Sequence, residues 1–441
     1  MPRSRKSLRL LIVIVQLALA TRLSAAEPSM LTLYEAQERA LRNHPRISVA
    51  ELRALAAKEV TRQARSGFFP TLTANVTAAS GADDNTRLAA GALNNPSIFQ
   101  RNAEGLVLSQ IITDFGRTAN LTASANFRAR ADEENAEATR AQIMLQVSAA
   151  YFSALQAQAV LRVARQTVAT RQLLLDQISV LASNKIRSDL DVGLARVSFE
   201  EGRLMRSKAS NDVDAAFISL STLLGERKPQ SFQIVEEPLP AAFPTNADAM
   251  IVEAMGRRPD LIRLRFEHDA AIKFARAEKA LHYPVISAVA SAGVVPLHDS
   301  HFENNYAAAG VNLSLPLFNG FLFSGRQKEA ELKAAAAEQS LRDEENKTIR
   351  DVRIALLDAN NALDRLRISE QLLVEARRTY ALAEARYKVR SSSFVELSQA
   401  ELNAVSAEIG NASARYETQL QEQILRFQTG AIVPDSGKLK R

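Results

Sequence analysis

Two segments alternate strictly between apolar and polar residues, the pattern of β-strands whose two faces meet different surroundings. The apolar positions of residues 71–78 and 310–315 include Leu72, Ala74, Val76, Ala78, Leu313 and Leu315. Residues 106–111 and 285–294 are weaker strand candidates. The alternation predicts two β-hairpins. The first has strands at about 71–80 and 103–112, and the second at about 285–294 and 306–315.

Two long windows, residues 97–228 and 317–433, contain no proline and little glycine. Alanine, leucine, arginine, glutamate and glutamine fill them, and all five favour helix. They predict long helices at about 117–182 and 327–390, each followed by a short polar turn and a further helix, at about 189–225 and 394–429. Apolar stripes from Ile368 to Tyr387 and from Leu402 to Phe427 have coiled-coil spacing, so antiparallel helical hairpins are expected.

The two halves of the chain carry the same signals in the same order. Pro45 and Pro259, which both open a helix, are separated by the same distance as Pro70 and Pro284, which both follow an aromatic residue. The order short helix, hairpin, long helix, polar turn, long helix occurs twice, which indicates a structural duplication. We assign the repeats to residues 27–225 and 247–430, with a proline-rich linker at 226–246 and a tail at 431–441.

Residues 1–26 have the features of a signal peptide. Basic residues precede an apolar run, Leu10 to Ala20, which is shorter than the roughly 20 residues of a spanning helix, and small residues follow. The formal charge of +6 comes largely from this segment, so the remaining chain is nearly neutral and does not resemble a nucleic-acid binder. The chain has no cysteine, which excludes disulfides and an acylated lipoprotein cysteine.

The sequence contains no motif typical of catalysis. A nucleophile elbow, a phosphate loop, a dinucleotide fingerprint and a zinc-protease motif are all missing. His298, Asp299, His301 and Glu303 cluster in a predicted loop. Loop histidines are more often solvated than metal-bound, so we predict no metal, no cofactor and no enzymatic activity.

Four motifs, in this order and within the duplicated frame, resemble the TolC-type outer-membrane efflux proteins. They are the segments Asn43-His44-Pro45, Phe69-Pro70-Thr71-Leu72, Asp191-Val192-Gly193-Leu194-Ala195-Arg196 and Ser314-Leu315-Pro316-Leu317-Phe318-Asn319-Gly320. The resemblance implies a mainly α fold with a β-barrel part. In a homotrimer, four transmembrane strands per protomer complete a twelve-stranded barrel, and the long coiled-coil helices form a periplasmic α-barrel. It also implies a passive exit duct for a tripartite efflux pump or a type I secretion system, partnered by a periplasmic adaptor and an inner-membrane pump.

Physical reasoning favours a shared barrel independently of the resemblance. Four strands are too few to close, and open strand edges are not tolerated in hydrocarbon. We therefore expect outer-membrane lipid to meet the apolar face, at Leu72, Ala74, Val76, Leu313 and Leu315, while Thr77 and its polar neighbours face water. The chain lacks tryptophan, so the aromatic girdle is expected from Phe68, Phe69, Tyr283, Phe318, Phe321 and Phe323 at the hairpin ends.

The resemblance also points to a periplasmic entrance just beyond the helical turns, where acidic side chains narrow the tunnel in the family. Glu396 stands at the first acidic position, and Asp191 is its counterpart in the other repeat. Gln399 stands where a second acid is common, Tyr387 matches a tyrosine of the turn, and the usual turn glycine is replaced within residues 388–390. We therefore expect an entrance with weaker cation selectivity.

The alternative is a soluble periplasmic coiled-coil adaptor or scaffold. Such a protein needs no membrane strands, so the two alternating hairpins count against it. The sequence does not indicate the cargo.

Overall fold

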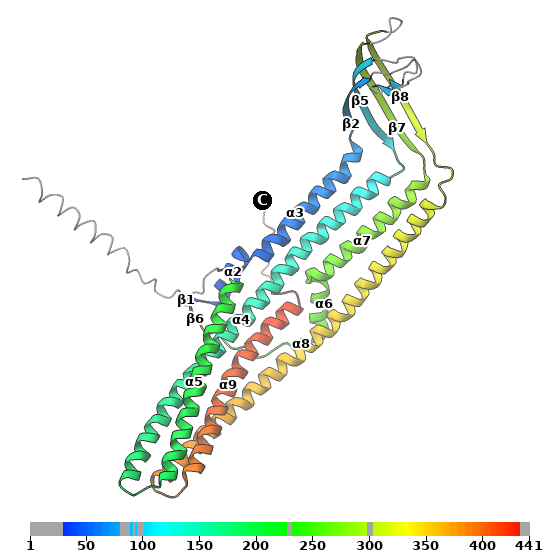
Figure 1. Ribbon diagram of the computed structural model, residues 1–441. Helices are drawn as coiled ribbons and strands as arrows, with labels where there is room; N and C mark the ends of the chain where they lie inside the picture. Colours follow the sequence, from blue (N-terminus) through cyan, green and yellow to red (C-terminus); the bar gives the residue numbers. More distant parts are fainter. Residues whose placement is uncertain are drawn as a thin grey trace, which may run out of the picture. The chain divides into compact units, whose positions relative to one another are not determined.

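The computed structural model describes residues 30–79, 89–90, 93–94, 101–226, 232–297 and 303–432 (Figure 1). The predicted signal peptide therefore lies outside the described residues. The chain divides into two compact units. The tip unit comprises residues 1–44, 143–243 and 358–423, and the strand unit comprises residues 45–142, 244–357 and 424–441. Both halves of the sequence contribute to each unit.

The strand unit contains an antiparallel four-stranded sheet with the order β2-β5-β7-β8 (Figure 1). Its strands are β2 (Thr71–Ala79), β5 (Arg101–Thr113), β7 (Val285–Leu297) and β8 (Asn305–Ser314). The short strands β3 (Ala89–Ala90) and β4 (Leu93–Asn94) pair with each other. The two predicted hairpins are thus neighbours in one sheet, joined through β5 and β7.

The predicted strand bounds need correction on three strands, β5, β7 and β8. Strand β5 runs past both predicted ends, with register shifts between Asn102 and Glu104 and between Ile111 and Thr113. Strand β7 continues to Leu297, three residues beyond its predicted end. Strand β8 ends at Ser314, so Leu315, predicted to be a strand residue, lies just outside it. Pro316 follows and has no N–H to donate, which favours an end to the ladder here.

Helices join the sheet within the strand unit. They are α3 (Pro45–Arg65), α6 (Ala247–Arg257), α7 (Pro259–Lys279) and the first parts of α4 (Arg117–Ser183) and α8 (Leu322–Lys388). Helix α8 begins five residues before the predicted residue 327, because Gly325 lies inside the first turn instead of marking its start. Gly320 and Phe321 have positive φ of 62° and 69° and turn the chain into the helix. Among the described residues, no helix is both long and apolar enough to cross a membrane.

The tip unit is built from two helical hairpins. The first joins α4 to α5 (Asp189–Leu223) and the second joins α8 to α9 (Phe394–Gln428). Helix α2 (Leu33–Asn43) lies in the same unit, as does a parallel pair of short strands, β1 (Met30–Leu31) with β6 (Gln233–Ile234). The buried Tyr151 hydroxyl of α4 lies 2.9 Å from the Leu31 carbonyl and 2.6 Å from that of Val235, which ties the linker to the helix.

The buried stripes of α8 and α9 agree with the predicted ones at Ala383, Tyr387 and Tyr416 and differ from them elsewhere. Leu402 and Ile368, which the apolar spacing places in the helical seam, are 52% and 64% exposed. The residues buried instead are mostly small, namely Leu397, Ala400, Ala404, Ala407 and Ala414. Alanine allows helices to approach closely, so the seam within one chain follows the alanines and leaves several larger side chains uncovered.

Both helical turns have the same backbone geometry. Lys185 and Arg390 are left-handed, with φ of 57° and 61°. The amide of Ile186 donates to the carbonyl of Leu181 at 2.9 Å, and the equivalent bond from Ser391 to Arg386 is 2.8 Å. These are the bonds of a Schellman motif, which ends a helix and usually places glycine at the left-handed position. Helix α8 therefore ends at Lys388, before the predicted residue 390.

Candidate membrane face and helical tips

The strand register places most large apolar side chains of the sheet on one face. Leu72 pairs with Leu108, which pairs with Ala290, which in turn pairs with Ala309. The apolar residues on this face are Leu72, Ala74, Val76, Leu106, Leu108, Ile286, Ala288, Ala290, Ala292, Val294, Ala307, Ala309, Val311 and Leu313. The register also places Glu104, the partner of Val76 and Val294, and Gln110 on it. Val76 is 78% exposed and Leu313 is 64% exposed. Four of the five residues predicted to meet lipid therefore share a broad, uncovered apolar face.

The opposite face of the sheet is more polar, although it also carries Val107, Ile111, Val285 and Val289, and two of its glycines make room for a tyrosine. Gly105, Gly293 and Tyr306 occupy one row across β5, β7 and β8. A Cβ added at either glycine would collide with the Tyr306 hydroxyl, so the tyrosine side chain lies across its two neighbouring strands. Glycine is needed here for space, not for an unusual φ. The sequence shows Tyr306 and the glycines but gives no sign that they meet.

The outer edges of the sheet have no strand beside them in the described part of the chain. Strand β2 pairs only with β5, and strand β8 pairs only with β7. Both edges expose backbone N–H and C=O groups that another strand could satisfy.

Exposed aromatic side chains gather where strands meet helices in the strand unit. Those predicted from sequence and found exposed are Phe68, Phe69, Tyr283, Phe318 and Phe321, whereas Phe323 is half-buried. Phe115 was missed, although it is 52% exposed and its ring centroid lies 5.9 Å from that of Tyr283. Its position directly before Gly116, at the end of a strand candidate, is the signal that could have found it.

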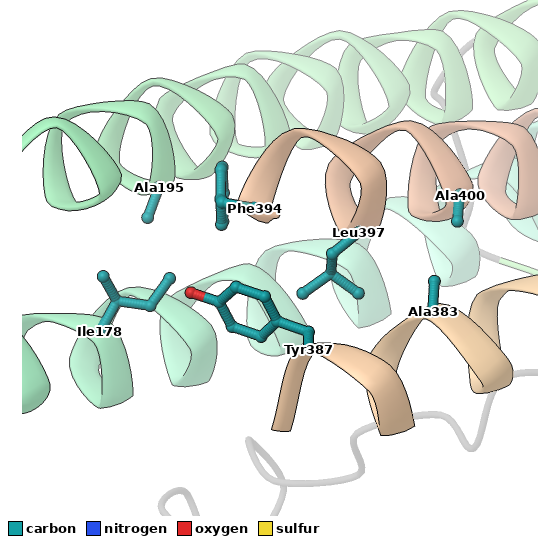
Figure 2. Packing of buried hydrophobic residues seen from close by; sticks show 7 residues of the cluster. All are labelled: Ile178, Ala195, Ala383, Tyr387, Phe394, Leu397 and Ala400. Atoms are coloured by element: carbon teal, nitrogen blue, oxygen red, sulfur yellow. The ribbon is translucent and has the colours of Figure 1, made fainter. Parts of the chain in front are cut away.

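Tyr387 is buried between the two helical hairpins. It is 6% exposed and packs in a cluster with Ile178, Phe394 and Leu397 (Figure 2). Arg187, from the α4–α5 turn, donates from Nη2 to the Tyr387 carbonyl at 3.2 Å. Its guanidinium carbon lies 4.3 Å from the ring centroid, a cation–π contact. The tyrosine and arginine therefore fasten one turn to the other.

The Tyr387 hydroxyl is buried and has no hydrogen-bond partner among the described residues. Burial raises the pKa of Tyr387, the nearby Arg187 partly opposes this, and Asp191 adds to the rise. The phenol therefore stays protonated at neutral pH.

The other three predicted entrance residues have local partners. Glu396 is exposed and forms an ion pair of 3.1 Å with Arg386, while exposed Gln399 donates to Asn403 one turn further along. Asp191 forms a capping box with Ser188 at the start of α5. The structure thus places Asp191 near Tyr387 but shows no direct bond that joins Glu396, Gln399 and Asp191 to one another. The ion pair of Glu396 with Arg386 was not predicted, because a sequence does not show which charged residues of a helix are paired and which are only solvated.

A buried ion pair and a hydrogen bond from its arginine connect three helices of the tip unit. Arg171 of α4 and Glu401 of α9 are 7% and 6% exposed in their side chains, and their charged groups lie 3.0 Å apart. Arg171 also donates to the Ser198 carbonyl of α5 at 2.7 Å. Burial raises the pKa of Glu401, although Arg171 lowers it in part. Gly202 leaves room for the arginine, since a Cβ there would meet its Cδ at 3.3 Å.

No cluster of three or more potential metal-binding side chains occurs among the residues that the structure describes. His298, Asp299 and His301 lie outside those residues, and of that sequence cluster only Glu303 is described.

Comparison with known proteins defines the class. The family model for outer membrane efflux proteins matches residues 36–226 and 250–431. Outer membrane protein TolC of Salmonella enteritidis is 23% identical over 96% of this chain and 86% of its own length. A probable efflux pump outer membrane protein of Pseudomonas putida, TtgC, is 25% identical over 83% of this chain and 76% of its own length.

Solved structures have the same fold. The outer membrane protein VceC of Vibrio cholerae superposes with a TM-score of 0.77 over 90% of this chain and 96% of its own, at 18% identity. The outer-membrane channel OprN gives a TM-score of 0.77 over 90% of both chains, at 20% identity. The chain belongs to the outer membrane efflux protein family, and its place is the outer membrane. The predicted fold class, with duplicated halves, is confirmed.

Proposed function

We propose that this protein is the passive exit duct of a tripartite efflux or type I secretion system, and that it works as a homotrimer. Each protomer contributes its four-stranded sheet to one closed outer-membrane barrel, and the long helices form the periplasmic tunnel. Residues 1–26 act as the export signal. A periplasmic adaptor and an inner-membrane pump deliver the cargo, so the chain needs no catalytic centre.

The sheet is the observation that carries this proposal. Its apolar face is exposed, and the outer edges of β2 and β8 have no neighbouring strand in the described chain. From Ile286 to Val294 the apolar face extends about 27 Å along the strand, at about 3.4 Å per residue. That length suits a tilted strand in an outer membrane whose apolar band is about 25 Å tall. Closing β2 of one copy on β8 of the next would satisfy both edges.

Uncovered apolar side chains on the tip-unit helices support contact between copies. On α5 the exposed residues are Leu190, Val197, Leu204 and Ile218. On α8 they are Ile368, Leu372, Val374, Leu382 and Val389. The α5 set recurs at multiples of seven residues, as do Ile368, Leu382 and Val389 on α8, and seven is the repeat of a coiled-coil seam. A second copy of the chain is the partner that the proposed trimer supplies for them.

In this proposal the periplasmic entrance lies at the two helical turns. Glu396, Gln399 and Asp191 border it, and Tyr387 holds the hairpins together beneath Arg187. The ion pair of Glu396 with Arg386 reduces the negative charge that cations would meet, which favours weak cation selectivity.

Mass and conductance test the proposal together. We expect the detergent-extracted protein to have the mass of a trimer by light scattering and to form pores in planar bilayers. A monodisperse monomer that keeps its helix content in detergent-free buffer would reject the duct and favour the soluble adaptor.

A further inference from the structure

One row of the sheet carries a tyrosine packed across two glycines. Tyr306 on β8, Gly293 on β7 and Gly105 on β5 are aligned by the strand register. The tyrosine side chain crosses both glycines, because a Cβ built on either one would collide with its hydroxyl. Besides that ring, the atom nearest to such a Cβ on Gly105 is the Ala292 carbonyl oxygen, at 3.3 Å. The space above Gly105 is therefore filled by Tyr306.

Shape, and not a hydrogen bond, holds the tyrosine in this place. Its hydroxyl is buried and has no hydrogen-bond partner among the residues that the structure describes. A buried hydroxyl without a partner costs free energy. Glycine inside a strand weakens the strand as well, since it has no side chain to pack. Three unfavourable choices in a single row indicate a use for the arrangement.

The apolar face of the sheet fixes the register between β5 and β7 only weakly. Leu108 pairs with Ala290, and on β7 further alanines stand two residues to either side, at Ala288 and Ala292. A slip of two residues would set the leucine against another alanine. It would also keep every side chain on its own face, because the side-chain period of a strand is two.

The opposite face discriminates little better, apart from the tyrosine row. Val107 and Val289 each face a serine in the structure. A two-residue slip in one direction would pair the two valines with each other, which is no worse for an apolar side chain. The register therefore needs another determinant.

Only Gly105 leaves room for the tyrosine on β5. It is the single glycine of that strand, as Gly293 is of β7. After a slip of two residues, the tyrosine row would end at residue 103 or 107. The residue types there, alanine and valine, carry the Cβ that Gly105 lacks, in the space that the phenol needs. The tyrosine therefore disfavours both slipped registers.

We propose that Tyr306 is a positioning residue: its ring, seated on Gly105 and Gly293, selects the register in which the hairpin of the second repeat joins the hairpin of the first. An aromatic side chain laid over a strand glycine pins the register of its neighbours. The two hairpins are far apart in the chain, so no short turn sets their register.

The register decides where the free edge of β8 lies. A two-residue slip would displace that edge along the strand by about 7 Å, at about 3.4 Å per residue. Closure of a barrel requires a fixed stagger of its strands, so displaced edges would not meet correctly in neighbouring copies. This consequence rests on the proposed function, whereas the register within one chain does not.

Disulfides within one chain report the register. The sequence has no cysteine, and Ser109 and Val289 are direct partners across β5 and β7. Cysteines at these two positions should form the disulfide of the native register. Cysteine at Ser109 combined with cysteine at Ser287 or Ser291 reports a slip. Those pairs are diagonal neighbours, at about 7–8 Å, and become direct partners only after a slip of two residues.

Each pair is introduced into the full-length protein, oxidised in outer membranes and quantified by peptide mass spectrometry. In Tyr306→Ala we expect the slip disulfides to rise at least about fivefold relative to the native disulfide, since the aromatic cross-strand contact is lost. Tyr306→Phe should leave the ratio unchanged, because the hydroxyl has no partner in the described chain. A general loss of stability would not change which cysteines meet.

Glycine substitutions separate the ring contact from general damage to the sheet. Gly105→Ala should lower the yield of inserted protein with the native disulfide, yet cause no further loss in the Tyr306→Ala background. Gly293→Ala should be harmful in both backgrounds, since its Cβ would also collide with the Glu104 carbonyl oxygen. Gly310→Ala on β8 is the matched control, because a Cβ there meets no atom within 4 Å.

An unchanged ratio of slip to native disulfide in Tyr306→Ala would overturn the inference, and so would equal losses for Gly105→Ala and Gly310→Ala. If too little Tyr306→Ala reaches the membrane to be measured, the comparison of those two glycine variants decides. The reporters lie within one chain, so they read the register whether or not copies share a barrel. A monomeric unmodified protein would contradict the duct alone.

Discussion

The sheet of the strand unit and the helical hairpins of the tip unit both expose apolar side chains, but they space them differently. On the sheet, most of one face is apolar, from Leu72 across to Leu313, and its charged residue, Glu104, pairs with Val76 and Val294 toward the start of β5. On α5, Leu190, Val197 and Leu204 stand seven residues apart, with charged side chains between them. A continuous apolar face suits lipid, because fluid acyl chains adapt to any apolar surface. Apolar residues that recur every seven positions suit another helix, because the side chains of that helix pack between them. The spacing of exposed apolar residues, more than their number, therefore indicates the partner.

The largest effect is expected inside the tip unit, where charge is buried. Arg171→Met leaves Glu401 buried without its partner and should lower the free energy of unfolding by about 3–5 kcal/mol. Arg203→Met, which removes an exposed pair with Glu200, should cost less than about 1 kcal/mol. Denaturant unfolding followed by circular dichroism measures both. If the two variants lose similar amounts of unfolding free energy, the ion pair of Arg171 with Glu401 does not hold the helices together.

The next effect tests the apolar face of the sheet. Leu313→Arg puts a charge beside Ile286 on the apolar face and should cost about 2–4 kcal/mol if the site is near the bilayer midplane. Asn312→Arg, one residue along and on the opposite face, is the matched control and should insert better. Outer-membrane fractionation of the two variants compares them. Equal loss of insertion would contradict the assignment of the faces.

A smaller effect concerns acid stability of the strand unit. Burial alone would raise the pKa of Asp260, but its hydrogen bonds from Arg258 outweigh this and hold the pKa below its usual value. A lowered pKa in the folded state contributes stability above the unfolded value of 3.8, and this contribution is lost as pH falls through the folded value. Asp260→Asn should cost about 1.5–3 kcal/mol at neutral pH and flatten the acid limb of a plot of melting temperature against pH. An unchanged acid limb would show that Asp260 does not carry this dependence.

The smallest effect on stability is expected at the Tyr387 hydroxyl. Tyr387→Phe removes a buried hydroxyl without a partner, so the free energy of unfolding should change by less than about 1 kcal/mol. Tyr387→Ala empties space beside Ile178 and Phe394, so it should loosen the turns and raise baseline conductance in bilayers.

The charge of the entrance is tested separately in the same bilayers. Glu396→Ala should lower cation preference, and Asp191→Ala should have a smaller effect because that carboxylate caps α5. If Glu396→Ala keeps its selectivity and Tyr387→Ala its conductance, the constriction lies elsewhere along the tunnel.

Local features of the fold could be predicted from the sequence, and features that depend on packing could not. The strand period of two is a local property, so alternation alone placed Leu72 and Val76 on one face. The helical seam from Leu402 was right at Tyr416, which is buried, and wrong at Leu402, which is exposed. Alanines next to the predicted positions form a second apolar stripe that packs more closely. The Arg171–Glu401 pair joins residues 230 positions apart, and nothing local shows that these two charges meet.

The central claim is that the sheet is one part of a barrel shared between copies, and cross-linking across the sheet edges tests it most directly. The chain has no cysteine, so any disulfide that forms must join the introduced cysteines. Cysteines at Thr73 or Asn75 on β2, combined with Gly310 or Asn312 on β8, should form disulfides where Cα atoms of neighbouring copies come within about 7 Å. We predict that at least one pair gives a covalent trimer in outer membranes. If oxidation leaves every pair monomeric while the protein is membrane-inserted, the shared barrel is contradicted.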